Sequence, residues 1–410
     1  MRPMGPIGPI GPIRLIGLIG VLSLMACSAE QEMPEEPAVP ETATAISFSG
    51  TEGTEEQVTR GAFRTYGAYE AYRTYKTNKT AGSTRAAQGL EELLPDGKKF
   101  FKVWAYKNSG NDYEGLQTVM EDYTVRWVDR SAYTTTSNTN DWEYVNQQSA
   151  GSPEQTIKYW DWSATAYRFF GVTGGVTGTF GSYESYGDHS TYEITIPVDA
   201  TSEKEAENTP YYSRLWFSTG NLADYPTRQF GKPVQLEFLR PIARVRFMFI
   251  YEDPKDKEYT VLAVKGFGPT TSGKRIYQVG TVKITYPLKG TQTTESYSVT
   301  PTDNGASGLS DDGIPAFTQY YYETPNNVNA RKWYSVLPAI NQGTYTLDVK
   351  VNGNDKTTVV PAAYMNWKPG FQYTYVFKIH VDGSVSISAV NAAFTPWVVE
   401  DPFNHTVYNW

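Results

Sequence analysis

The sequence predicts an all-β protein built from two tandem β-sandwich domains, and three observations lead to this prediction. No long run among the 410 residues places apolar side chains at the i, i+3, i+4, i+7 spacing of an amphipathic helix. Short runs of alternating apolar and polar residues recur instead, and Gly, Asn, Asp and Pro separate them. Strands at this spacing, joined by turn residues, are typical of sandwiches.

Residues 1–26 are expected to form a secretory signal peptide. Arg2 and Arg14 flank a Gly-Pro-Ile run, and an apolar stretch follows at 15–25. As a helix this stretch would reach about 16 Å, which is well short of the ~30 Å hydrocarbon layer. It leads into Leu-Met-Ala-Cys, which resembles the bacterial lipobox and implies that Cys27, the only cysteine, carries a lipid. The alternative is a buried cysteine in an ordinary signal peptide.

Residues 27–44 are acidic and rich in proline, with few apolar side chains to bury, so we expect a disordered tether. Two or more acyl chains on Cys27 would anchor the protein stably to a membrane, whereas one would bind marginally. Acidic residues directly after a lipid-bearing cysteine also resemble a surface-export signal of some Gram-negative anaerobes. The alternative is a solvated linker that carries no export signal.

Two hairpins are predicted near the C-terminus. In "QYTYVFKIHV" alternate residues from Tyr373 to Val381 share one face, Asp382-Gly383 makes a two-residue turn, and "SVSISAV" returns. Before it, "TYTLDVKV" and "KTTVV" flank the turn at Asn352-Gly353. Further strands are expected in "FFKVWAYK", "YTVRWV", "TYEITIPV", "RLWFST", "VQLEFL", "ARVRFMFIYE", "EYTVLAVKGF" and "TVKITYPL".

The best domain boundary is the cluster of turn-forming residues at 218–233. It predicts an N-terminal sandwich at 45–230 and a C-terminal sandwich at 231–410. In the strand that follows the boundary, Ala243, Val245 and other apolar residues alternate with Arg244 and Arg246, so we expect one buried face and one charged face.

A polar, Tyr-rich arm is expected within the first domain at 60–88. Its tyrosines recur every third residue at 66, 69, 72 and 75, a period that no strand has and that fits a 3₁₀ or polyproline-like helix better than an α-helix. The arm is interpreted as a surface insertion or a flexible segment, and an aromatic binding strip is the alternative.

Catalytic and metal-binding patterns are missing from the sequence. His189, His380 and His405 have no metal-ligand spacing, and neither a nucleophile elbow nor a phosphate-binding loop occurs. We therefore expect no enzyme activity, no cofactor and no metal. The net charge of −8 argues against nucleic-acid binding, which favours a basic face.

Several segments together resemble the fimbrillin family, the type V pilins and accessory subunits of Gram-negative anaerobes. The resemblance covers most of the chain after Cys27, and its motifs are specific only in combination. It rests on the lipobox and on "AISFSG", "VTRGAF", "FFKVWAYK", "QTIKYWDWSATAYRFFG", "PVQLEFLRPIARVRFMFIYE", "WKPGFQYTYVFKI" and "FTPWVVED". One departure is Leu239-Arg240, where relatives often carry His-Ala, and no function is attached to it.

The resemblance implies two tandem transthyretin-like sandwiches in a lipid-anchored precursor on the cell outer membrane, with other fimbrial subunits as partners. In shaft subunits of the family, an Arg-specific protease removes an N-terminal strand and a strand of the next subunit fills the groove. Here the removable strand would carry Ile46 and Phe48. Arg60 is the first candidate for the cut and Arg85 the second, unless both are ordinary loop residues. The donor would come from 394–410, although its alternation is poor.

Two other kinds of protein remain possible. One is a surface lipoprotein that binds carbohydrate through exposed aromatic rings, and the placement of Trp142, Trp160 and Trp162 distinguishes it. The other is a scaffold that never polymerises. The sequence leaves open a shaft, tip or anchor role, and it leaves open the host or bacterial surface ligand.

Overall fold

The computed structural model divides the chain into two compact units, residues 1–43 and 44–410. Apart from Ala43, all residues that the structure describes belong to the second unit. The signal peptide, Cys27, the tether up to residue 42, the Tyr-rich arm with Arg60 and Arg85, and the segment 394–410 lie outside the described residues. The structure describes residues 43–53, 89–128, 134–181, 189–251, 261–269, 276–302, 314–318, 328–329, 333–338, 343–351 and 353–393.

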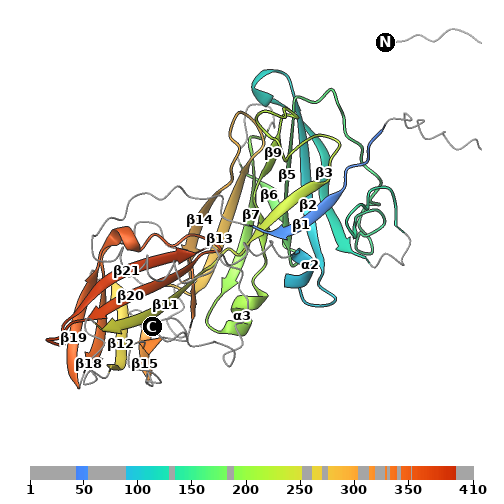
Figure 1. Cartoon of the computed structure of the whole chain (residues 1–410). Helices are drawn as coiled ribbons and strands as arrows, with labels where there is room; N and C mark the ends of the chain where they lie inside the picture. The colour runs from blue at the N-terminus through green and yellow to red at the C-terminus, as the bar shows by residue number, and fades with distance from the viewer. Residues whose placement is uncertain are drawn as a thin grey trace, which may run out of the picture. The chain divides into compact units, whose positions relative to one another are not determined.

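The predicted all-β sandwich fold is confirmed (Figure 1). Helical structure in the described ranges is limited to α2 (Leu90–Leu93), α3 (Glu203–Asn208) and two 3₁₀ turns. None of these helices is long and apolar enough to cross a bilayer.

The first sandwich pairs an eight-stranded sheet with a four-stranded sheet. The larger sheet runs in the order β1-β10-β8-β5-β2-β3-β4, with β9 beside β5. Its strands are β1 (Phe48–Glu52), β2 (Phe100–Ser109), β3 (Gly115–Trp127), β4 (Trp142–Glu143), β5 (Ala166–Thr173), β8 (Tyr212–Ser213), β9 (Trp216–Ser218) and β10 (Val234–Leu239). The smaller sheet, β14-β13-β7-β6, comprises β6 (Gly178–Phe180), β7 (Thr191–Asp199), β13 (Val279–Pro287) and β14 (Ser296–Pro301).

The larger sheet is buried on both faces. On one face, Trp104 and Phe170 pack with residues of the smaller sheet such as Ile194 and Ile284. On the other face a second core contains Phe48, together with residues of α2 and of the segment around Trp142 and Trp160. Every residue of the central strand β5 is buried, as expected for a strand covered on both sides.

The second sandwich contains a five-stranded sheet, β16-β11-β20-β21 with β17 beside β11, and a four-stranded sheet, β15-β12-β18-β19. Phe247 and Tyr375 from the first sheet share a core with Leu347 and Val349 from the second. The strands are β11 (Ala243–Tyr251), β12 (Val261–Pro269), β15 (Ile314–Thr318), β16 (Val328–Asn329), β17 (Tyr334–Val336), β18 (Tyr345–Val351), β19 (Asn354–Val360), β20 (Gln372–Ile379) and β21 (Val385–Ala393).

The sheets are not divided at residue 230, where the sequence analysis places the boundary. Strand β10 lies beyond it and pairs with β1 and β8, and β13 pairs with the whole of β7. The first sandwich therefore takes strands from both sides of the expected boundary. The division into domains at 45–230 and 231–410 stays a prediction. The strands group differently because β10 and β13, which follow residue 230, pair with strands that precede it.

Two local expectations are wrong. The turn between β20 and β21 is one residue longer than predicted, because His380 and Ser384 pair and Gly383 adopts a φ of 76°. As a consequence Val381, expected on the buried face, is 55% exposed. On β11, Arg244 was expected on a charged outer face but is 3% exposed.

Candidate functional site: the groove filled by β1

Strand β1 is the edge strand of the eight-stranded sheet, and it runs parallel to β10 (Figure 1). Phe48 is opposite Val234 and Glu52 is opposite Phe238. On the outer side of β1, the described residues pair only through isolated bridges at Ala45 and Thr51. Removing β1 would therefore break one continuous ladder and leave the edge of β10 open.

Two side chains fasten this segment to the core. Ile46 and Phe48 are fully buried, as the alternation predicts. The Phe48 ring lies 6.2, 5.9 and 5.9 Å from the ring centres of Phe101, Tyr144 and Phe169. Burying two such side chains stabilises the strand by about 3–6 kcal/mol. We define the β1 groove as the surface of the sandwich that β1 covers.

Tyr144 contacts both the backbone and a side chain of this segment, since it hydrogen-bonds to Ile46 and its ring packs against Phe48. Its hydroxyl donates to the Ile46 carbonyl oxygen at 3.0 Å and accepts from the backbone N–H of Lys158 at 3.0 Å. Burial raises the pKa of Tyr144 well above its usual value, so the phenol keeps its proton. Next to it, Ile46 donates its N–H to the Lys158 carbonyl at 2.8 Å.

The middle of the groove is narrow. A Cβ on Gly50 would lie 2.9 Å from Cδ2 and 3.0 Å from Cβ of Leu90, which is a fully buried residue of α2. Real Cβ atoms do not approach so closely, so Leu90 would have to shift before any larger residue could occupy this position. Because β1 ends at Glu52 and α2 begins at Leu90, Arg60 and Arg85 both fall between them in sequence.

The far end of the groove is charged. Glu52, Arg240 and Arg244 are 7%, 8% and 3% exposed. Arg240 donates from Nη1 to the carbonyl oxygens of Ala206 at 3.0 Å and Glu207 at 3.2 Å, which closes the C-terminal turn of α3. Its guanidinium carbon also lies 4.5 Å from the ring centre of Tyr211.

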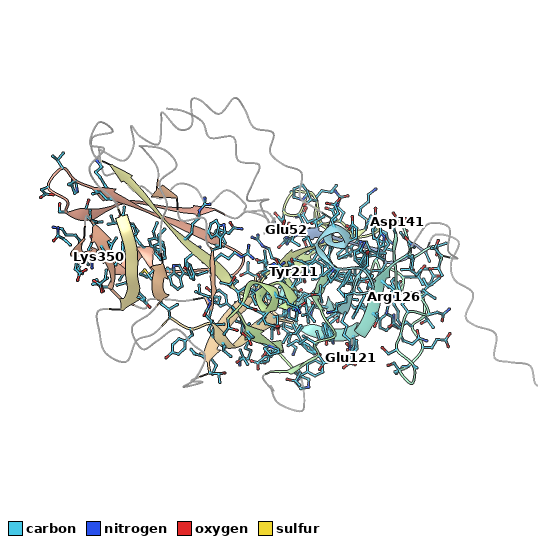
Figure 2. The ribbon with its side chains drawn as sticks, turned by 90° about the horizontal axis from the view of Figure 1, so that it is seen from below. Glu52, Glu121, Arg126, Asp141, Tyr211 and Lys350 are labelled. Atoms are coloured by element: carbon cyan, nitrogen blue, oxygen red, sulfur yellow. The ribbon has the colours of Figure 1, made fainter. Side chains whose placement is uncertain are left out.

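Electrostatic interactions connect these charged groups. Burial lowers the pKa of Arg240, while Tyr211, Glu207 and Glu52 act in the opposite direction. Burial raises the pKa of Tyr211, and the charges of Arg240, Glu52 and Arg244 also act on it. Figure 2 labels Glu52 and Tyr211 in this part of the molecule.

Sequence reasoning missed this charged end. It noted Arg240 without a role and placed Arg244 on an outer face. The signal available was the period of two along β1, which continues from Ile46 and Phe48 through Gly50 to Glu52. The candidate processing residues Arg60 and Arg85, and Cys27, lie outside the described residues.

The aromatic residues named for carbohydrate binding do not share an exposed face. Trp142 and Trp160 are 1% and 4% exposed and belong to the core, whereas Trp162 is 62% exposed. Trp160 stacks on Phe230 with the ring centres 5.4 Å apart. The flat strip of three tryptophans that this alternative requires is therefore not formed.

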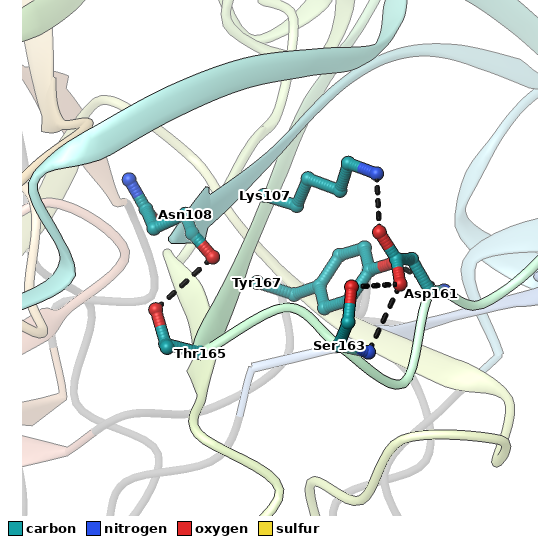
Figure 3. A network of polar contacts seen from close by, with 6 residues as sticks. All are labelled: Lys107, Asn108, Asp161, Ser163, Thr165 and Tyr167. Carbon is teal, nitrogen blue, oxygen red and sulfur yellow. Dashed lines mark hydrogen bonds and ion pairs between the residues drawn. The ribbon is translucent and has the colours of Figure 1, made fainter. Parts of the chain in front are cut away.

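Trp162 lies in a turn between Asp161 and Ser163, and the Ser163 backbone N–H donates to the Asp161 carboxylate at 2.9 Å. Figure 3 shows the polar contacts of Asp161. The Asp161 carboxylate accepts from Lys107 Nζ at 2.6 Å and from the Ser163 hydroxyl at 2.6 Å. These hydrogen bonds lower the pKa of Asp161 to about 2, and the bond from Lys107 contributes most. Its backbone N–H donates to the Tyr167 hydroxyl at 2.7 Å, and burial raises the pKa of Tyr167 to about 12.

The described residues contain no group of three or more His, Cys, Asp or Glu side chains that could hold a metal ion. His380 lies on the hairpin of β20 and β21, where Nε2 is 2.7 Å from the Ser386 hydroxyl. His189 stacks on Phe180 with the ring centres 3.9 Å apart. His405 lies outside the described residues. The two described histidines thus lie apart in the fold, one on the β20–β21 hairpin and one against Phe180 of β6.

No family model and no curated protein matches this chain. Solved structures with a detectable likeness are named as fimbrial or candidate cell adhesion proteins. One is a fimbrial protein from Bacteroides vulgatus, with 13% identity, a TM-score of 0.35 and coverage of 72% of this chain and 93% of that chain.

A candidate cell adhesion protein from Bacteroides ovatus has 12% identity and a TM-score of 0.38, with coverage of 87% of this chain and 98% of that chain. A fimbrial assembly protein from Parabacteroides distasonis has 8% identity and a TM-score of 0.31, with coverage of 84% and 98%. At these scores the likeness carries no conclusion about the activity of this chain.

Proposed function

We propose that this protein is a structural or adhesive subunit of a cell-surface fimbria, made as a lipid-anchored precursor on the outer membrane and joined to other subunits by β-strand exchange. The observation that carries the proposal is the placement of β1. It is an edge strand with one continuous ladder, yet the side chains of Phe48 on the strand and Ile46 just before it are fully buried. A strand in this position hides an apolar groove that a strand from another subunit could fill.

The chain order supports a protease trigger. A cut after Arg60 or Arg85 would separate β1 from α2 and from the rest of the sandwich. The strand would then be held by non-covalent contacts alone and could leave. The exposed groove would be costly in water, so an incoming strand would bind tightly and leave slowly.

Lipidation adds a consequence of the same cut. If Cys27 carries the lipid, the lipid and β1 belong to the same N-terminal fragment. Cleavage would then release the body of the subunit from its membrane anchor at the moment the groove opens. A Cys27→Ala precursor should not incorporate radioactive palmitate, and normal incorporation would contradict the lipid anchor.

The test of assembly uses the purified precursor and an Arg-specific protease. We expect a cut after Arg60 or Arg85, followed by a ladder of oligomers that survives mild detergent. The matched control is the Arg60→Lys, Arg85→Lys double variant, which keeps both charges and removes both cut sites. A precursor that is cut at these residues and stays monomeric, while the double variant still assembles in cells, would contradict this trigger and favour an uncut accessory subunit.

A further inference from the structure

The β1 groove has a chemical pattern that goes beyond a generic apolar cleft, and an inference about its occupant follows if the proposed strand exchange occurs. We propose that the groove selects a donor strand from another polypeptide that carries a carboxylate at the position of Glu52 and a glycine at the position of Gly50. Arg240 and Arg244 would recognise the carboxylate, and Leu90 would exclude larger residues.

The charged end argues for the carboxylate. When β1 leaves, the carboxylate of Glu52 leaves with it, whereas Arg240, in the connection between β10 and β11, and Arg244, on β11, stay behind. Arg240 is held by the α3 carbonyl oxygens and by Tyr211, so it cannot turn to solvent without breaking those contacts. Glu207 stays near Arg240 after the cut, but the loss of Glu52 removes part of the negative charge that stabilises this buried cation, which is unfavourable. A donor strand with a carboxylate removes that penalty, and a neutral donor does not.

The narrow middle argues for the glycine. Leu90 is fully buried and follows both candidate cut sites in the chain, so it remains part of the trimmed subunit. A donor with a side chain at this position would have to displace it. Selectivity then comes both from an attractive contact and from a steric one, as is common in specific interfaces.

The C-terminal segment of this chain matches only part of the pattern. In the direction of β1, Glu400 follows Phe394, Pro396 and Val398 at a period of two, but Val398 stands where β1 has Gly50. A second copy of this chain would therefore be a poorer donor than β1 itself. The favoured occupant is a strand from a different subunit with glycine and a carboxylate two residues apart.

The experiment uses the full-length precursor with a sequence-specific protease site inserted after Arg60. After the cut, a fluorescent peptide with the sequence of residues 44–53, TAISFSGTEG, competes for the groove, and anisotropy reports its binding. Matched peptides carry Glu52→Gln, which keeps size and removes charge, or Gly50→Val. Peptides of residues 393–402, with and without Val398→Gly, complete the set.

We expect the Glu52→Gln and Gly50→Val peptides to bind at least about tenfold more weakly than the native peptide. The Val398→Gly change should strengthen binding of the C-terminal peptide. Equal binding of the native and Glu52→Gln peptides would overturn the charge requirement, and equal binding of the Gly50→Val peptide would overturn the steric one. Both outcomes would leave the proposed strand exchange intact.

A different result would contradict the proposed function itself. If the cut precursor binds none of these peptides while its β1 fragment has dissociated, the groove does not accept strands and both proposals are wrong. A second readout needs no added peptide. The Glu52→Gln precursor, once cut, should lose its own β1 fragment faster than the cut native precursor, as measured by size-exclusion chromatography.

Discussion

Each sandwich contains one parallel strand pair among the described residues, and the two pairs differ in what holds their strands. In the second sandwich, β20 pairs with β11 over eight positions and antiparallel with β21 on its other side. In the first, β1 pairs with β10 over five positions and has isolated bridges on its other side. Phe377 on β20 and Phe48 on β1 are both fully buried. The depth of burial is the same, but only β1 can leave by breaking a single ladder.

This comparison teaches that burial and permanence are separate properties. A strand in the middle of a sheet opens only when the whole domain unfolds, whereas an edge strand can open locally at a smaller cost. The parallel pair of the first sandwich therefore contains an edge strand that can open locally, whereas in the parallel pair of the second sandwich both strands have neighbours on both sides.

The largest loss of stability should come from a change on β20, the strand that has neighbours on both sides. Phe377→Ala removes a fully buried ring that packs near Phe247, with the ring centres 6.3 Å apart. We expect it to lower the free energy of unfolding of the second sandwich by about 3–5 kcal/mol, as measured by urea denaturation. Val381→Ala is the control, because Val381 is 55% exposed and should change little. A loss below about 1 kcal/mol for Phe377→Ala would break the comparison.

Phe48→Ala should weaken the first sandwich in a different way. The change removes a ring of the same size, but its cost to global stability is limited to the free energy that holds β1 in place. We expect a smaller shift of the urea transition than for Phe377→Ala, together with much faster hydrogen exchange at β10. Thr51→Ala on the same strand is the control. An equally large loss of global stability would show that β1 is as permanent as β20.

Acid should affect the first sandwich through Asp161. Its folded-state pKa of about 2 lies below the usual value of an aspartate, so its stabilising effect is present above about pH 4 and is lost as the pH falls through 2. Because the Asp161 side chain is 37% exposed, solvent screening limits the effect to less than about 1 kcal/mol.

The Asp161→Asn variant checks this pH dependence. We expect it to reduce the slope of first-sandwich stability between pH 4 and pH 2 while leaving the second sandwich unchanged, as followed by urea denaturation at each pH. An unchanged slope would assign the acid sensitivity to other carboxylates. Glu143 is then the first to test: burial raises its pKa, but hydrogen bonds from Ser137, Thr135 and Val145 outweigh this and lower it.

The smallest effect is expected at Trp162. Its ring is 62% exposed, so Trp162→Ala should change the free energy of unfolding by no more than about 0.5 kcal/mol. Trp160→Ala, two residues away, is the contrast, because the Trp160 side chain is buried and its ring packs against Phe169 and Phe230 with ring centres 5.7 and 5.4 Å apart. If Trp162→Ala abolished binding on a glycan array while leaving stability unchanged, the carbohydrate-binding alternative would regain support.

Local patterns predicted much of this fold. Alternation identified the buried face of β1 from Ile46 and Phe48, and Asn352-Gly353 placed the turn between β18 and β19. The sequence could not reveal that β13 would join β7, since pairing across about 80 residues leaves no local period.

The charged end of the site was hidden for a related reason. The alternation on β11 indicated that Arg244 faces outward, because an arginine is rarely buried without a partner. Glu52, whose charge acts on Tyr211 as that of Arg244 does, lies far away in the sequence and is placed beside β10 by the parallel pairing of β1. The burial of Trp142 and Trp160 also could not be predicted from the sequence, since aromatic residues occur both in cores and on binding faces.

The central claim is that β1 leaves the first sandwich while the rest remains folded. Hydrogen exchange with mass spectrometry on the full-length precursor, before and after a cut at Arg60, tests it most directly. We predict that the cut greatly accelerates exchange in β1 and β10 and leaves β11 and β20 as protected as before. If the cut left β1 and β10 unchanged, or if all four strands lost protection together, β1 would be an integral part of the fold and the account would be wrong.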